Sequence, residues 1–260
     1  MPRFDETVIS KAIVGTYAKK LLDRIESDVL IVGAGPAGMT AAQCLADKGL
    51  KVTIIEKRLS PGGGIWGGGM AMNEVVIQEN VLPLLKGLGV GCQLVGDGFY
   101  TVDSVELAVG LCFKALKSGA VLFNLMTVQD VCVHKGRVVG VVVNRSLVGD
   151  SLPVDPITFS AKAVIDGTGH EAAVVQTLRG RGLLQGSAFD DTCEGPMDAA
   201  SGEDFVANKV AEVYPGLWVS GMSVCAAVGG PRMGPIFGGM LLSGIRVADL
   251  ICEQLGRSTK

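Results

Sequence analysis

A glycine-rich turn near the start of the chain has the residue types that bind phosphate. The pattern G-x-G-x-x-G occupies residues 33–38, between the apolar run 28–32 and a segment of small residues that ends near Gly49. Glycines at this spacing permit a tight turn and let backbone N–H groups and a helix dipole approach a pyrophosphate. Glu56 ends the next apolar run, where a carboxylate can accept hydrogen bonds from both ribose hydroxyls. The pattern predicts an adenosine-diphosphate ligand, and it disfavours NADP because Glu56 would repel a 2′-phosphate.

Asp155 and His170 form a second group that could do chemistry. Asp155 lies in a Pro-Val-Asp-Pro turn, and His170 follows an apolar run through Gly-Thr-Gly. A carboxylate and an imidazole are a partial ligand set for iron or manganese, with positions left for a substrate. The alternative is a turn-capping aspartate and a hydrogen-bonded histidine, and the spacing alone leaves both open.

Arg232 and Trp66 lie in two further glycine-rich segments. Arg232 belongs to the run GGPRMGPIFGG at 229–239, where a guanidinium could hold a small carboxylate bidentately. It could equally bind the carbonyl groups of its own loop. Trp66 lies between two glycine triplets, and it could close over a ligand or pack beneath the loop.

Met222 bears on which dinucleotide is bound. Flavoproteins that begin with such a turn usually have a late strand ending in Gly-Asp, whose carboxylate binds the ribityl chain of the flavin. The corresponding run here, at 217–222, ends in Gly-Met. A thioether cannot replace that carboxylate as an acceptor, and this disfavours FAD.

The elements that would position these residues alternate between apolar strands and helices. Strands are predicted at 28–32, 51–56, 161–165 and 217–220, a hairpin at 121–144, and helices at 5–26, 36–49, 103–117 and 237–255. This order indicates an α/β fold, a doubly wound parallel sheet of the FAD/NAD-binding flavoprotein-like kind. We expect a single dinucleotide-binding domain over residues 1–260, with a smaller β-rich insert at about 70–160.

Three connecting segments are predicted from periodicity and composition. Residues 73–86 are predicted to form a helix that is kinked or restarted near Pro83. Residues 61–70 are expected to form no regular element because six of the ten are glycine. Residues 183–204 are polar and aperiodic, so a long loop is expected there. Such a loop could act as a mobile lid.

Composition excludes several classes of protein. The 260 residues include 23 basic and 26 acidic ones, a balance that disfavours nucleic-acid binding. The longest uncharged stretch, 214–231, contains two prolines and four glycines and is therefore not predicted to span a membrane. No signal peptide is evident at the N-terminus, and the seven cysteines form no C-x-x-C pair. A cytoplasmic protein without nucleic-acid or membrane partners is expected.

Taken together, these motifs resemble the thiamine thiazole synthase family, in its archaeal and bacterial sulfide-using form. The similarity covers about residues 5–255. Its most specific parts are the tryptophan between two glycine triplets at 62–69 and the run RMGPIFGGM at 232–240. Further matches lie at 32–38, 56–61, 154–156 and 166–171.

The resemblance implies that NAD is a substrate and that glycine and sulfide are the others. Nicotinamide is expelled, the ADP-ribose opens and isomerises, glycine condenses with it as an imine, and sulfur closes an adenylated thiazole carboxylate. The resemblance also implies that Asp155 and His170 hold Fe(II), with Asp155 supplied by a neighbouring subunit of a homo-octamer. Arg232 would bind the carboxylate of glycine. The residues implied around the NAD-derived part are Gly33, Gly35, Ala37, Gly38, Glu56, Lys57, Gly64, Val128, Val154 and Met222.

Position 153 departs from the family pattern. Eukaryotic relatives have a cysteine there that gives up its own sulfur, whereas archaeal relatives have a histidine and use free sulfide. Pro153 can neither donate sulfur nor act as a base, which implies a multiple-turnover enzyme that consumes sulfide, with iron delivering the sulfur to the imine. Ala37 is a smaller departure, since several relatives have serine.

Two other functions remain open from the residues alone. An FAD-dependent oxidoreductase would begin with the same strand, glycine turn and helix. A non-catalytic protein that binds an adenylate or carries a metal is conceivable because of Pro153.

Overall fold

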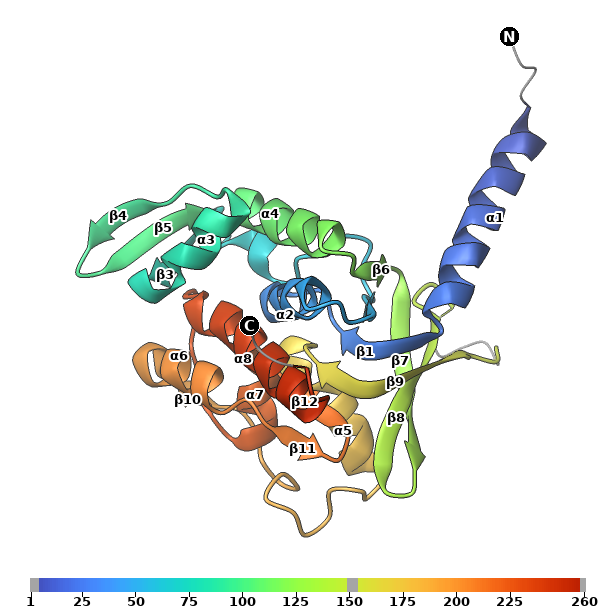
Figure 1. The fold of residues 1–260 in the computed structure, drawn as a ribbon. Coiled ribbons are helices and arrows are strands. Elements are labelled where there is room, and N and C mark those ends of the chain that lie inside the picture. Colours follow the sequence, from blue (N-terminus) through green and yellow to red (C-terminus); the bar gives the residue numbers. More distant parts are fainter. Residues whose placement is uncertain (1–4, 149–153, 258–260) are drawn as a thin grey trace.

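The computed structural model describes residues 5–148 and 154–257, and an eight-stranded sheet forms its centre (Figure 1). The strands β12-β9-β1-β2-β6 pair in parallel in that order. β11 pairs antiparallel with β12, and the hairpin β7–β8 joins β9 antiparallel through β8. The strands are β1 (Glu26–Val32), β2 (Val52–Ile55), β6 (Val121–Phe123), β7 (Met126–His134), β8 (Arg137–Arg145), β9 (Ile157–Asp166), β11 (Glu212–Tyr214) and β12 (Leu217–Val219).

β1 lies at the centre of the parallel strands because its side chains are apolar on both faces. Val29, Leu30 and Ile31 are fully buried, as is usual for a parallel strand covered on both sides. The last residue of β1, Val32, is paired with Ile55 of β2 and with Asp166 of β9. The carboxyl ends of three strands therefore meet at one edge of the sheet. The predicted doubly wound α/β fold is confirmed.

Helices cover the sheet, and the two that pack most closely are α2 and α8 (Figure 1). Gly244 of α8 lies against the backbone of α2, where a Cβ would come within 2.5 Å of the Ala37 carbonyl oxygen. A larger residue at 244 would therefore push α8 away from α2. The helices are α1 (Glu6–Arg24), α2 (Pro36–Asp47), α3 (Leu82–Leu88), α4 (Ser104–Lys117), α5 (Ala173–Gly180), α6 (Ala199–Asn208), α7 (Met222–Val228) and α8 (Gly238–Gln254).

Residues 70–160 contain two antiparallel parts. A three-stranded sheet of order β3-β5-β4 stands apart from the central sheet, next to α3 and α4 (Figure 1). The hairpin β7–β8, in contrast, belongs to the central sheet. A further small sheet pairs β10 with β13. These strands are β3 (Glu74–Gln78), β4 (Gln93–Gly96), β5 (Phe99–Asp103), β10 (Gly195–Met197) and β13 (Pro231–Arg232).

The helix predicted at 73–86 is wrong over its first half. Residues 74–78 form β3, with Val75 and Ile77 buried and their neighbours more exposed, which is the two-residue alternation of a strand. α3 begins only at Leu82. Pro83 lies in its first turn, where the missing N–H costs nothing, so it starts the helix instead of kinking it.

Three other predicted segments need smaller corrections. Residues 121–133 are not one strand, because Leu125 adopts a φ of +55° and separates β6 from β7. Residues 65–67, expected to be irregular, form a single 3-10 turn. The expected loop 183–204 ends at 194, since β10 pairs with β13 and α6 begins at 199, capped by the Asp198 side chain.

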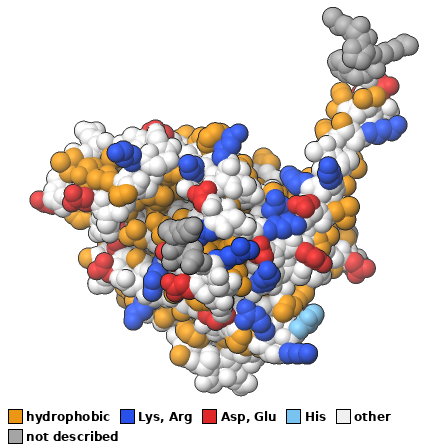
Figure 2. All heavy atoms as spheres, viewed as in Figure 1, with side chains coloured by type: hydrophobic (Ala, Val, Ile, Leu, Met, Phe, Trp, Pro, Cys, Tyr) orange, Lys and Arg blue, Asp and Glu red, His pale blue; other side chains and the backbone are white. Residues whose placement is uncertain are grey.

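Two apolar surfaces lie on helices. α1 extends away from the sheet, and in the described part of the chain none of its residues is buried. Figure 2 shows hydrophobic side chains along this helix. α4 carries a second exposed apolar stripe. None of the helices within the described residues is both long and apolar enough to cross a bilayer. The exposed large apolar residues on these two helices are Val8, Ile9, Ile13, Val14 and Leu22 on α1, and Val105, Val109, Phe113 and Leu116 on α4.

Glu203 connects α6 to the start of α8 through a buried carboxyl group. Its side chain is 2% exposed, and Oε1 accepts a hydrogen bond from the Gly239 backbone N–H at 2.6 Å. Oε2 is buried and finds no hydrogen-bond partner among the described residues. Burial raises the pKa of Glu203 from 4.5 to about 7.

The raised pKa of Glu203 predicts that stability falls as the pH rises. Between about pH 5 and pH 7 the folded chain binds a proton at Glu203 that the unfolded chain lacks, so stability present at low pH is lost as the pH rises through 7. The loss should reach about 3 kcal/mol. We expect Glu203→Gln to remove this loss while keeping the acceptor for Gly239. Free energies of unfolding at fixed protein concentration from pH 5 to 8 would measure it, and parallel pH profiles for the two proteins would contradict it.

Candidate functional site

A cavity of about 540 Å³ opens at the carboxyl edge of the parallel strands, where the chain leaves β1, β2, β9 and β12. Ligands of open α/β sheets bind at this edge. The cavity brings together ten of the thirteen site residues expected from the sequence. These are Gly33, Gly35, Ala37, Glu56, Lys57, Gly64, Val128, His170, Met222 and Arg232.

The glycine-rich turn joins β1 to α2, as the motif predicts. Gly33 has a φ of +101°, and a Cβ there would lie 2.4 Å from the Gly167 carbonyl oxygen. Gly35 precedes the first residue of α2, which has no side-chain cap, so the N-terminal end of the helix adjoins the cavity. Gly38 is not a lining residue; it permits close packing, because a Cβ there would lie 2.2 Å from the Gly33 carbonyl oxygen.

Glu56 is held rigidly beside this turn. Its Oε2 accepts a hydrogen bond from the Ala34 N–H at 2.8 Å, and its Oε1 accepts one from the Arg58 N–H at 2.7 Å. The residue is only 5% exposed although it lines the cavity. Each carboxylate oxygen has a second lone pair, so the side chain keeps acceptor capacity for ribose hydroxyls.

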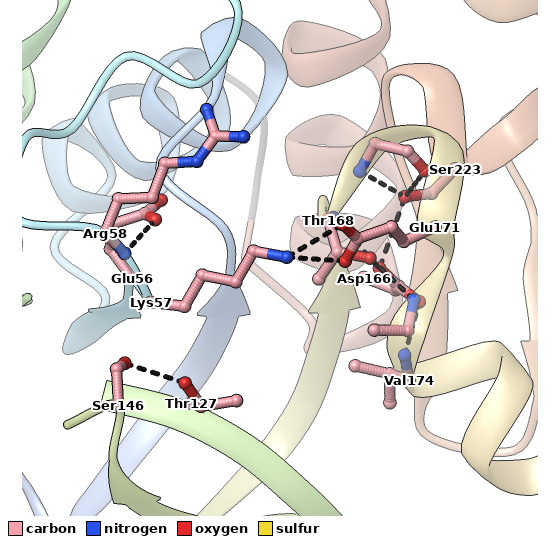
Figure 3. Close-up of polar contacts among 12 residues, drawn as sticks. Glu56, Lys57, Arg58, Thr127, Ser146, Asp166, Thr168, Glu171, Val174 and Ser223 are labelled. Atoms are coloured by element: carbon pink, nitrogen blue, oxygen red, sulfur yellow. Dashed lines mark hydrogen bonds and ion pairs between the residues drawn. The ribbon is translucent and has the colours of Figure 1, made fainter. Parts of the chain in front are cut away.

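Lys57 and Glu171 form an ion pair at the cavity (Figure 3). The Lys57 Nζ lies 2.6 Å from Glu171 Oε2 and 2.8 Å from Oε1. Lys57 follows β2 and Glu171 follows β9, so the pair joins the two strands that flank β1. Lys57 therefore already has an anionic partner next to the glycine-rich turn.

The Asp166 carboxyl group accepts hydrogen bonds that fix the turn 167–171 (Figure 3). It is fully buried at the end of β9, and Oδ1 accepts from the Thr168 N–H, the Thr168 hydroxyl and the Ser223 hydroxyl. Oδ2 accepts from the N–H groups of Val174 and Val175 in the first turn of α5. Burial raises the pKa of Asp166, against the opposite effect of these hydrogen bonds. The carboxyl group thus ties the turn that carries His170 to α5 and α7.

Glu194 connects His170 with Arg232. The Nδ1 atom of His170 lies 2.8 and 2.9 Å from the two carboxylate oxygens of Glu194. The Nε atom of Arg232 lies 3.6 Å from Glu194 Oε2. Within the described residues the guanidinium group of Arg232 pairs with this carboxylate and with no loop carbonyl. Glu194 is not among the residues predicted from the sequence, because nothing local marks it: it approaches Arg232 only because β10 lies beside β13.

Asp155 and Val154 lie far from the cavity within one chain. Both are exposed and precede β9, whereas His170 follows the other end of that strand. A ten-residue strand spans about 30 Å, far beyond the length of two metal–ligand bonds. The described residues contain no group of three or more metal-ligating side chains, and Pro153 lies outside the described residues. Asp155 and His170 of the same chain therefore cannot share a metal ion.

Trp66 packs on its own loop and does not line the cavity. Its Nε1 donates a hydrogen bond to the Pro61 carbonyl oxygen at 2.6 Å. A Cβ at Gly62 would lie 2.4 Å from the same nitrogen, so the indole covers the glycine backbone. The arrangement favours packing within the loop over closure on a ligand.

Comparisons with known proteins agree on one family. The model of the Thi4 family matches residues 10–237. The thiamine thiazole synthase of Thermotoga maritima is 50% identical, covering 96% of this chain and 98% of the relative. That of Thermococcus kodakarensis is 49% identical, covering 97% and 99%. A crystal structure of Thermovibrio ammonificans THI4 is similar with a TM-score of 0.93 and 42% identity, covering 98% of this chain and 99% of that one.

Proposed function

The chain belongs to the Thi4 family of thiamine thiazole synthases, and we propose that this enzyme of thiamine biosynthesis makes ADP-thiazole carboxylate from NAD, glycine and free sulfide. The reaction would depend on Fe(II), release nicotinamide, run for multiple turnovers and take place in the cytoplasm. One observation carries the proposal: a single cavity is lined both by the glycine-rich turn and by His170 and Arg232, which the Glu194 carboxylate joins.

The nucleotide half of the cavity suits the ADP part of NAD. The pyrophosphate would lie at the N-terminal end of α2, and Glu56 would accept hydrogen bonds from the adenosine ribose. Lys57 would neutralise phosphate charge. Met222 lines the cavity directly after β12, where a flavin would need a carboxylate, and this supports NAD over FAD.

Arg232 is suited to bind the carboxylate of glycine. Its side chain is 51% exposed and lines the cavity, and Glu194 contacts the Nε side of the guanidinium group. The two terminal nitrogens offer the parallel donors that a carboxylate prefers. Held in this way, glycine would keep its amino group free to condense with the opened sugar.

The donor chemistry of His170 fits iron, although one chain does not complete the site. Imidazole and carboxylate together suit Fe(II), and Glu194 occupies Nδ1 of His170, which leaves Nε2 for a metal. We propose that His170 and Asp155 of a second copy hold the ion. Bound iron would supply the sulfur-transfer chemistry.

A metal site shared by Asp155 and His170 requires an oligomer. The length of β9 separates Asp155 from His170 within one chain, so a shared site needs a second copy. The apolar stripes on α1 and α4 are surfaces of the kind that subunit contacts bury. We propose a homo-oligomer, with the octamer as the expected size.

Anaerobic incubation with NAD, glycine, sulfide and Fe(II) tests the proposal. We expect release of nicotinamide and a new product with the mass of an adenylated thiazole carboxylate, in several equivalents per chain. Intact NAD after prolonged incubation would contradict the proposed reaction. A protein that retains absorbance near 450 nm after desalting would indicate the alternative, an FAD-dependent oxidoreductase.

The ion pair between Lys57 and Glu171 predicts that a substitution strengthens NAD binding. In Glu171→Gln, Lys57 loses its anionic partner and becomes available to phosphate. Since an exposed ion pair contributes up to about 1 kcal/mol, we expect the affinity for NAD to rise by up to about fivefold. Calorimetric titration would measure it. Glu106→Gln, on α4 outside the cavity lining, is the matched control, and weaker binding by Glu171→Gln would refute the prediction.

A further inference from the structure

We propose that Glu194 is a positioning residue that orients His170 and Arg232 together, so that one carboxylate aligns the metal-binding and the carboxylate-binding groups. The inference rests on the proposed function for the identity of the two ligands. Its geometric basis is independent of that function, because the contacts of Glu194 are present in the protein alone.

Glu194 selects one tautomer of the His170 ring. An ionised carboxylate only accepts hydrogen bonds, so a neutral imidazole beside it must donate from the nitrogen that it presents. That nitrogen is Nδ1, at 2.8 Å from Oε1 and 2.9 Å from Oε2. The lone pair is then on Nε2, in a residue that lines the cavity. Carboxylates that hold a ligating histidine in this way fix its tautomer and orient the ring.

Glu194 also restrains Arg232. The Glu194 side chain is 16% exposed, and its Oε2 lies 3.6 Å from the guanidinium Nε. A charge pair at a partly buried carboxylate is less screened than one at the surface. The half-exposed Arg232 side chain is therefore drawn toward the cavity wall, with its terminal nitrogens left for an incoming carboxylate.

The backbone around Glu194 is fixed on both sides, as a positioning role requires. On one side, the next residue, Gly195, donates from its N–H to the Gly230 carbonyl oxygen at 2.8 Å and pairs with Pro231. On the other side, the Thr192 hydroxyl accepts a hydrogen bond from Arg179 at 2.6 Å. The carboxylate is thus held against the strand that carries Arg232, unlike an acid on a free loop.

Two substitutions at Glu194, made in a background with a single histidine, separate its effect on His170 from its effect on Arg232. Glu194→Ala removes both contacts, so the His170 ring should populate both tautomers and the affinity for Co(II) should fall by about 10- to 100-fold. Glu194→Gln keeps an oxygen for Nδ1 and removes the charge that attracts Arg232. We expect it to retain the tautomer and most of the Co(II) affinity but to bind glycine less well in the presence of NAD. His134→Asn serves as the background, because the chain has two histidines and only His170 then remains.

The experiment uses the full chain labelled with ¹⁵N-histidine, without oxygen and at a pH where the ring is neutral. Long-range ¹H–¹⁵N correlations report the tautomer, and titration with Co(II) as the metal probe reports affinity. Loss of the single tautomer and of affinity in Glu194→Ala, with both kept in Glu194→Gln, supports the proposal. An unchanged tautomer in Glu194→Ala, with Co(II) affinity within twofold of the parent, overturns it. A tautomer change in a protein whose parent binds neither Co(II) nor Fe(II) supports the orienting role and refutes the proposed iron site.

Discussion

Asp155→Ala and His170→Ala should each abolish thiazole formation, whereas a mixed assembly of the two variants should recover it. A bound metal contributes several kcal/mol of charge stabilisation, so loss of one of its two proposed protein ligands should lower turnover by about 1,000-fold. Both variants should still bind NAD, because neither side chain is among the groups proposed to hold the pyrophosphate or the ribose. Turnover is measured as product per chain under anaerobic conditions.

The recovery follows from the position of Asp155 at one end of β9 and of His170 beyond the other. If each site takes its aspartate from a neighbour, some sites in a mixed assembly combine an intact His170 with an intact Asp155. Random mixing of equal amounts predicts about one quarter of the sites. Variants refolded or co-expressed together are compared with a mixture of His170→Ala and the double variant, which should stay inactive. Equal inactivity of both mixtures would show that the two residues do not meet across a subunit contact.

The core of the fold is predictable because its signals are local. A strand buried on both faces is a continuous apolar run, and β1 and β2 are such runs. The turn after β1 needs a positive φ at Gly33, and the packing of α2 against the turn needs Gly38. These requirements act within about twenty-five residues, so the motif also locates the part of the cavity where we propose that the nucleotide binds.

The misassigned segments depend on contacts that are distant in sequence. Residues 74–78 become a strand because β5 pairs with them, although Ile77, Val81 and Leu84 have the spacing of a helical face. Residues 195–197 become a strand because β13, more than thirty residues later, lies beside them. Neither pairing partner can be identified from the segment itself.

In the part of the cavity that contains His170 and Arg232, local sequence signals again identify some residues and not others. His170 and Arg232 stand out in their motifs, but Glu194, which joins them, is one of 26 acidic residues in an aperiodic segment. Asp155 lies far from His170 for a different reason. The spacing of fifteen residues between Asp155 and His170 says nothing of distance, whereas the strand that forms between them keeps them apart. The family resemblance had implied a neighbouring subunit, and the length of β9 supplies a physical reason for one.

Substitution of Asp166 should have the second large effect, although no local sequence signal marks this residue as important. Asp166→Ala leaves four donors without their acceptor in a fully buried site: two from Thr168 and the N–H groups of Val174 and Val175. The Ser223 hydroxyl keeps the Gly169 carbonyl oxygen as an acceptor. Breaking a buried hydrogen-bond network of this size should cost at least about 4 kcal/mol. For a chain of this length the Tm should fall by about 8–16 °C.

Asp166→Asn should cost about half as much, because an amide can place its oxygen toward Val174 and Val175 and its NH₂ group toward hydroxyls that can turn to accept. Both variants should also weaken NAD binding, since the turn 167–171 packs against Gly33. Thermal unfolding at fixed protein concentration measures the first effect and calorimetric titration the second. The control is Asp198→Ala, an exposed helix cap whose loss should lower the Tm much less than loss of the buried Asp166 carboxyl group. If Asp166→Ala were no less stable than this control, the network at Asp166 would not hold the turn that carries His170, and the position of His170 would need another cause.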